Sequence, residues 1–237
     1  DESDTAGFVQ VTNQYRTKYG IPFVDEIVAL RDYYGVSASK MSLILGFGPN
    51  QWRLYESGEV PSVSNGRMIR SIMKPSVFLE MVNSSRHLLS SKEFERLRLR
   101  MMGFMRESSD ESAYDVIRLF ASERGSDNGY GQISVDRLRN ILLYVIGKCG
   151  EVFCTKMNKL LFYIDFMAYR QLGRSITGLT YRALDYGPVP ERWSRIYSNF
   201  DEIIQEPRLI WDKEGIALLA ISDADVSGFT KEELQIM

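Results

Sequence analysis

The chain has 237 residues, of which 44% are hydrophobic and 25% are charged, and its formal net charge is −2. This length allows one large domain or two small ones, and the composition is typical of a soluble globular protein. No apolar run approaches the roughly 18 residues of a membrane helix, and no basic segment followed by an apolar one opens the chain. We therefore expect a cytoplasmic protein with no membrane contact.

The histidine and cysteine content argues against most catalytic and metal sites. The single histidine, His87, stands in a polar stretch, so a hydrolase built on an imidazole is not expected. Cys149 and Cys154 are too few to hold zinc alone, and we expect two ordinary thiols in a reducing compartment. No glycine-rich phosphate loop and no recognisable carboxylate pair is present, so we expect neither an enzyme nor a cofactor.

The balance of basic and acidic residues differs between the two halves of the chain. Up to Arg106 they slightly outnumber the acidic residues, and beyond it the balance is acidic. The half that can face DNA is thus the more positive one.

Residues 21–106 are predicted to form five short helices and a sixth, longer one, after an N-terminal arm at 1–20. The prediction depends on apolar residues at helical spacing and on polar, glycine and proline residues at the expected helix ends. The predicted starts are residue 22, Ser37, Gly48–Pro49, Ser62, Pro75 and Ser91, with Gly35, Gly46 and Gly58 as stops and a capping box of Ser90 and Glu93.

The second and third of these helices have the arrangement of a helix-turn-helix. Trp52 and Tyr55 are three residues apart and would anchor the third helix, so its other side chains face outward. Asparagine and glutamine can pair with adenine and arginine with guanine, while residues at the start of the preceding helix can contact phosphates. A plain helical bundle accounts for the spacing equally well. The predicted DNA contacts are Ser39, Lys40, Asn50, Gln51, Arg53 and Leu54.

Residues 54–58 with Pro61 following resemble the end of the recognition helix in repressors of the Xre/Cro type, and residues 27–73 resemble the DNA-binding half of MqsA-type antitoxins. In that family an asparagine matches Asn50, and an arginine stands where this chain has Leu54, so one base contact is missing. The resemblance implies operator DNA as a partner and a homodimer formed through the N-terminal half. It also implies that zinc, if any, is bound only in a module upstream of Asp1.

Residues 107–128 are predicted to be a linker that is first acidic and serine-rich and then turn-prone, with a short helix between Tyr114 and Phe120.

Residues 129–237 are predicted to be a helical domain with a small antiparallel β-sheet, which makes the whole chain mainly α, of the α+β class. The predicted elements are helices capped by Ser134 and Thr155, a strand over 179–186, a helix from Trp193, a hairpin turning at 212–215, and a final capping box of Thr230 and Glu233. The chain ends four residues later, so we expect the natural protein to continue.

Three segments in order, 159–163, 173–174 and 183–190, resemble the Panacea (SocA-like) antitoxin domain over the chain from about Asn128 to the end. Pro190 departs from the pattern, since many relatives carry valine there. We expect Tyr186 to end a strand and Gly187 and Pro188 to turn the chain into a helix, which presents free N–H groups and an aromatic ring. The simpler interpretation is that this turn only defines the fold and that the tyrosines are half-buried packing residues, not a binding surface. The toxin contacts predicted on this basis are Tyr163, Tyr169, Arg182, Tyr186 and Trp193.

The resemblance implies an antitoxin that binds its toxin through the second half and represses its own operon through the first. The toxin expected is one that blocks translation, including enzymes that resemble alarmone synthetases. Three alternatives stay open: a protease adaptor that delivers a toxin for degradation, a stand-alone regulator that senses a small molecule, and, least favoured, an enzyme.

Overall fold

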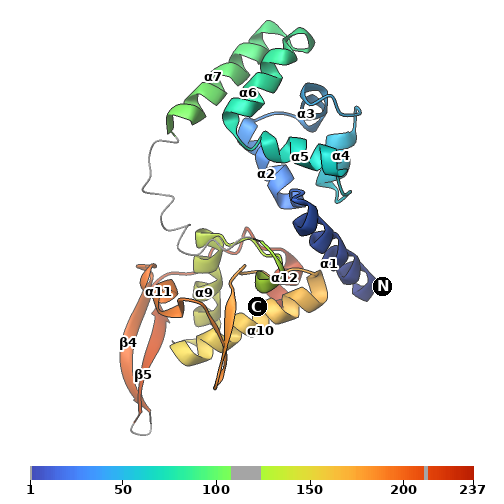
Figure 1. Cartoon of the computed structure of the whole chain (residues 1–237). Coiled ribbons are helices and arrows are strands. Elements are labelled where there is room, and N and C mark those ends of the chain that lie inside the picture. Colours follow the sequence, from blue (N-terminus) through green and yellow to red (C-terminus); the bar gives the residue numbers. More distant parts are fainter. Residues whose placement is uncertain (1, 108–123, 211–212) are drawn as a thin grey trace. The chain divides into compact units, whose positions relative to one another are not determined.

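The computed structural model describes residues 2–107, 124–210 and 213–237. The chain divides into two compact units, which we call the N-terminal unit (residues 12–112) and the C-terminal unit (residues 1–11 and 113–237). Helices dominate both units, and the strands described lie in the C-terminal unit (Figure 1). The predicted mainly α fold with a small antiparallel sheet is confirmed. Among the described residues, no helix has the length and apolar character needed to cross a membrane.

The first residues form a helix, α1 (Glu2–Tyr19), where the sequence predicted an arm. In the C-terminal unit, the Gln10 side chain donates a hydrogen bond of 3.0 Å to the Tyr169 carbonyl. In the N-terminal unit, Arg16 is only 1% exposed and donates to the carbonyls of Pro22 and Glu59. A helix that buries an arginine has weak apolar periodicity, and this is why the sequence pattern did not reveal it.

The N-terminal unit follows the predicted series of helices closely. Ser37 and Ser62 cap their helices by accepting hydrogen bonds from Lys40 N and Asn65 N. Gly35, with φ of 62°, ends the helix that precedes Ser37. The Ser90–Glu93 capping box is also present. The elements are α2 (Val24–Tyr34), α3 (Ala38–Ile44), α4 (Gln51–Glu56), α5 (Val63–Ser71), α6 (Pro75–Ser84), the 3-10 helix η1 (Arg86–Leu88) and α7 (Ser91–Glu107).

Two predicted starts in this unit are wrong by about one half-turn. Helix α2 begins at Val24 and not at residue 22. Helix α4 begins at Gln51 and not at Gly48–Pro49, because Asn50 has φ of −111° and ψ of 4°, outside the helical region. The first turn of α4 is held from another helix instead, since the buried Ser42 hydroxyl of α3 accepts a hydrogen bond of 3.0 Å from Trp52 N. A cap from a distant residue of this kind leaves no local trace in the sequence.

Large aromatic side chains fill the core of the N-terminal unit. The Tyr34 ring stacks on Phe78 with centroids 4.1 Å apart, and its hydroxyl donates to the Ile72 carbonyl. Trp52 is fully buried, as predicted for an anchor of α4. The antiparallel pair of α6 and α7 completes this unit (Figure 1).

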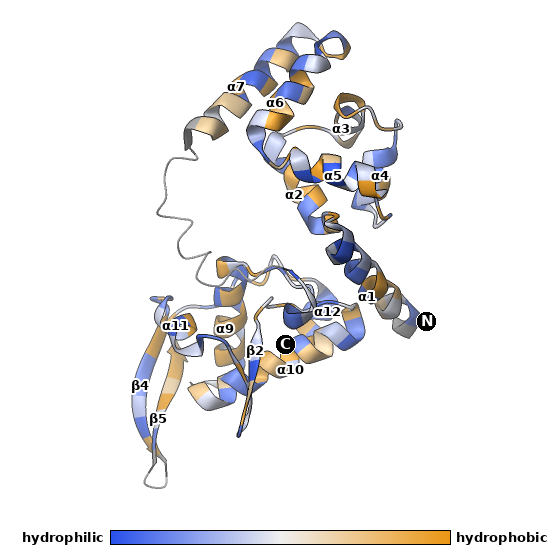
Figure 2. Cartoon of the chain, in the orientation of Figure 1, coloured by the Kyte–Doolittle hydropathy of each residue, from blue (hydrophilic) through white to orange (hydrophobic). Residues whose placement is uncertain are grey.

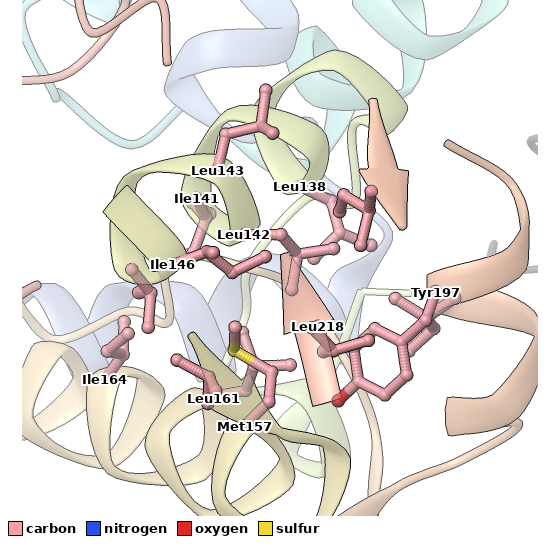
Figure 3. Packing of buried hydrophobic residues seen from close by; sticks show 14 of the residues in the cluster. Leu138, Ile141, Leu142, Leu143, Ile146, Met157, Leu161, Ile164, Tyr197 and Leu218 are labelled. Carbon is pink, nitrogen blue, oxygen red and sulfur yellow. The ribbon is translucent and has the colours of Figure 1, made fainter. Parts of the chain in front are cut away.

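The core of the C-terminal unit forms between two helices. Apolar and polar residues both occur along α9 (Val135–Cys149) and α10 (Cys154–Leu172), as expected for helices with one buried face (Figure 2). Leu142 and Ile146 of α9 meet Met157 and Leu161 of α10, and Tyr197 and Leu218 close the cluster from the other side (Figure 3). The elements are η2 (Ser126–Asn128), α9 (Val135–Cys149), β1 (Val152–Phe153), α10 (Cys154–Leu172), β2 (Tyr181–Leu184), β3 (Gly187–Pro190), α11 (Trp193–Ser198), β4 (Ile203–Ile210), β5 (Lys213–Ala220) and α12 (Lys231–Ile236).

The strands form one three-stranded antiparallel sheet, in the order β1–β5–β4, and one two-stranded hairpin, β2–β3. The one predicted hairpin is confirmed and consists of β4 and β5. Its predicted turn is wrong for residues 213–215, which lie in β5, since Ile210 pairs with Lys213. Asp212 lies outside the described residues, as does the helix predicted within residues 114–120.

The predicted turn at Gly187 and Pro188 is also wrong. Both residues lie in β3, where Gly187 pairs with Leu184 and Pro188 with Ala183, so the connection is Asp185–Tyr186 and no helix starts there. Proline lacks an N–H and is tolerated only on strands with a free edge, which both strands of a two-stranded hairpin have.

The last helix is fastened to the core by a buried carboxylate. Glu233 is 1% exposed, and its Oε1 lies 2.9 Å from guanidinium nitrogens of both Arg137 on α9 and Arg174 beyond α10. The other oxygen accepts from Thr230 N in the predicted capping box, which is confirmed. Burial opposes the charge, but the Thr230 amide and the two arginines outweigh it and hold the pKa of Glu233 below its ordinary value.

We predict that Glu233→Gln lowers the free energy of unfolding by about 1–3 kcal/mol, because two half-buried arginines lose their charged partner. A lowered folded-state pKa adds stability above the unfolded pKa of about 4.5 and loses it as the pH falls through the folded value. The difference between wild type and variant should therefore be full at pH 7 and shrink below pH 4.5 in urea titrations. Glu232→Gln, an exposed neighbour on α12, is the control, and an equal loss there would contradict the prediction.

Candidate functional site

The surface of the N-terminal unit that was predicted to contact DNA is built on α3 and α4. Glu56, at the end of α4, accepts hydrogen bonds from Arg31 of α2 and from the Trp52 indole, which lies 3.0 Å away. With the Ser42 cap at the other end, these contacts hold both ends of a helix of only six residues. The outward side chains of α4 are thus held in a fixed orientation.

The predicted DNA contacts divide into exposed residues and residues with partners inside the chain. Ser39, Asn50, Arg53 and Leu54 are exposed. Gln51 is half-buried and donates a hydrogen bond of 2.8 Å to a Glu59 carboxylate oxygen. The four exposed residues, three of them at α4, agree with the predicted outward face.

Lys40 takes part in an ion pair, with its ammonium 3.3 Å from a carboxylate oxygen of Glu93. Hydrogen bonds from Ser90, together with the Lys40 ammonium, lower the pKa of Glu93 to about 2. Glu93 therefore stays charged and keeps Lys40 beside the start of α3. An ammonium has three donors, so this pairing leaves Lys40 able to contact a phosphate.

In the C-terminal unit, the five residues predicted to contact a toxin do not form one cluster. Tyr163 is 60% exposed on α10, and Tyr186, in the β2–β3 turn, is 92% exposed. Arg182 is exposed and pairs with Glu191 at 2.9 Å. Tyr169 follows Tyr163 by six residues, about 240° around the helix, and its half-buried ring stacks on Tyr130. Trp193 is half-buried and packs beside the Tyr197 ring.

Two aromatic residues that the sequence reasoning did not select lie next to Tyr163. Phe166 is 55% exposed, and Phe162 stacks on it with ring centroids 6.0 Å apart. Phe162 also meets the Tyr163 and Tyr181 rings edge-on, at 5.7 and 5.4 Å. We call the exposed pair of Tyr163 and Phe166 the aromatic stripe. The Phe162 ring contacts both rings of this pair. The signal in the sequence was the spacing of three residues, which places both rings on one side of a helix.

A buried carboxylate joins the helix of the aromatic stripe to the β2–β3 hairpin. Asp165 of α10 accepts hydrogen bonds from Ile176 N at 2.9 Å, Thr177 N at 2.8 Å and the Tyr181 hydroxyl at 2.6 Å, and a further one from the Thr177 hydroxyl. Burial raises the pKa of Asp165 above its ordinary value, and these hydrogen bonds oppose the rise without cancelling it. This network holds Tyr181 at the start of β2, in contact with Phe162.

The two cysteines do not form a site. Cys149 is exposed and Cys154 is buried, and burial raises the pKa of the Cys154 thiol. Within the described ranges, no three histidine, cysteine, aspartate or glutamate side chains are grouped so that they could hold a metal ion.

Exposed aromatic side chains of this kind are enriched at protein interfaces. Residues 157–237 match the family model Antitoxin SocA-like, Panacea domain. The match supports an antitoxin-family role and begins within α10, later than the predicted start near Asn128. The SocA-like antitoxin family is not an enzyme family. No curated protein and no solved structure matches the chain.

We predict that Asp165→Ala lowers the free energy of unfolding by about 1–3 kcal/mol, because it removes both oxygens that accept hydrogen bonds from the following loop and strand. Amide hydrogen exchange at Ile176 and Thr177, followed by mass spectrometry, should become faster than in wild type. Asp185→Ala, in the exposed turn of the same hairpin, should leave both unchanged. Unaltered exchange in Asp165→Ala would show that the network does not hold this loop.

Proposed function

We propose that the chain is an antitoxin whose C-terminal unit binds and neutralises a protein toxin encoded by an adjacent gene. The observation that carries this proposal is the antitoxin-family match, which covers most of α10 and everything after it, together with the aromatic stripe on the same helix. Exposed aromatic side chains on a folded helix are the usual anchors of a protein interface. Neutralisation then needs no chemistry of the antitoxin itself, only occupation of a surface on the toxin.

We propose further that the N-terminal unit binds the promoter of its own operon as a homodimer. Support comes from α4, a short helix fixed at both ends, since Arg53 within it and Asn50 immediately before it are both exposed. These two side chain types can read adenine and guanine in the major groove, and dimers commonly read paired half-sites. Lys40 and Ser39 lie at the start of α3, where contacts to phosphates would set the orientation of α4.

Tyr163→Ala with Phe166→Ala should abolish growth rescue when the chain is co-expressed with the product of the adjacent gene. Truncated aromatic anchors each cost about 2 kcal/mol or more of binding free energy, so the dissociation constant of the double variant should rise on the order of 1,000-fold. Calorimetry with the purified pair measures that change. Leu88→Ala with Leu99→Ala removes exposed apolar side chains from the N-terminal unit and serves as the control. Equal loss of rescue in both variants would contradict the assignment of toxin binding to α10.

Asn50→Ala with Arg53→Ala should abolish binding to a promoter fragment in gel-shift assays and leave growth rescue intact. The reason is that base contacts set specificity while the toxin contacts lie in the other unit. The control, Lys92→Ala, removes one positive charge, as Arg53→Ala does, but at an exposed position of α7. It should weaken promoter binding only slightly. The assays need a fixed salt concentration, since phosphate contacts make the affinity salt-dependent. If growth rescue is lost together with promoter binding, the assignment of DNA binding to the N-terminal unit and toxin binding to the C-terminal unit is wrong.

A further inference from the structure

The aromatic stripe is the middle of a longer pattern along α10. Lys159 precedes Tyr163 by four residues and Arg170 follows Phe166 by four, so the four side chains recur at intervals of four, three and four. An α-helix has about 3.6 residues per turn, and this spacing therefore places all four on one side of α10. The two rings are flanked at each end by a basic side chain, and all four residues are exposed.

The core of the C-terminal unit is built on the other side of α10. The opposite side of α10 carries Met157, Leu161, Ile164 and Ala168, which are buried in the core of the C-terminal unit. Phe162 lies between the two sides and braces Phe166 against Tyr181. The exposed rings are thus ordered before any partner arrives, which reduces the entropy lost on binding.

The exposed charge on this helix has one sign. Lys156, Lys159 and Arg170 are exposed, and the one acidic residue of α10, Asp165, is buried and bonded to the hairpin loop. Within the part of the chain that the structure describes, none of these three basic residues has a carboxylate at ion-pair distance. The side of α10 that bears the aromatic stripe is therefore apolar in the middle and positive at both ends.

We infer that this side of α10 inserts into an apolar groove of the toxin that is rimmed at both ends by aspartate or glutamate. The inference rests on the proposed function and adds the chemistry of the partner. Ring anchors at positions i and i+3 are the pattern of a helix lying in a groove, and the flanking lysine and arginine require acidic groups where the groove ends. Nucleic acid is the other partner that aromatic and basic residues suit, but acidic and basic residues nearly balance over residues 124–237, whereas a backbone-tracking groove is broadly positive.

The test measures association kinetics of the full chain with the purified product of the adjacent gene, by surface plasmon resonance at low and moderate salt. Lys159→Glu with Arg170→Glu keeps both rings and reverses both flanking charges. We expect the association rate constant to fall about tenfold or more at low salt and its salt dependence to weaken or change sign. Lys148→Glu with Lys231→Glu changes the net charge equally at exposed positions outside α10 and should associate almost as wild type does.

The outcomes separate the inference from the function on which it rests. If wild type binds and the α10 reversal (Lys159→Glu with Arg170→Glu) associates as fast as the control (Lys148→Glu with Lys231→Glu), the inference of an acidic groove is refuted, while toxin binding stands. If wild type does not bind the adjacent product, the proposed function fails and the inference with it. A single-stranded oligonucleotide injected as a second probe should not bind, and binding that the α10 reversal removes would assign this surface to nucleic acid instead.

Discussion

The buried carboxylate of Asp165 is the interaction on which the candidate site depends. It lies on α10 yet accepts its hydrogen bonds from the loop and strand that follow, so it fixes the β2–β3 hairpin to the helix. A carboxylate removed from water is costly unless its lone pairs are occupied, and here they are occupied by two amides and two hydroxyls. The position of Tyr181, and through it that of Phe162, follows from this network.

Helix α10 consequently has two roles on two sides. Its apolar side completes the core with α9, where Met157 and Leu161 are fully buried. Asp165 and Phe162 lie on the way from that side to the solvent and face the hairpin. The remaining strip carries Tyr163 and Phe166, which are 60% and 55% exposed. Substitutions there are therefore expected to destabilise the fold less than substitutions at Met157 or Leu161.

The sequence was most informative where the physics is local. The caps at Ser37, Ser62 and Thr230 depend on hydrogen bonds within one helical turn, and each was predicted correctly. The failures are of two kinds. One involves a partner far along the chain, since nothing near Arg16 shows that the carbonyl of Glu59 will accept its hydrogen bond. The other is a matter of register, since the turn between β2 and β3 was predicted at Gly187 and Pro188 and lies at Asp185–Tyr186. Strand register and buried polar contacts are decided by the tertiary structure.

The site residues show the same division. Tyr163 and Tyr186 were selected as surface aromatics and both are exposed, whereas Tyr169 and Trp193 were selected with them and are half-buried. The spacing of about 3.6 residues per helical turn is enough to separate Tyr169 from Tyr163, and it would also have placed Phe166 beside Tyr163. Helical phase also gives the side of α10 that faces the core, because Met157, Leu161, Ile164 and Ala168 recur at helical spacing and are all buried. What phase cannot give is the set of partners of Asp165, because the Ile176 and Thr177 amides and the Tyr181 hydroxyl lie beyond the helix.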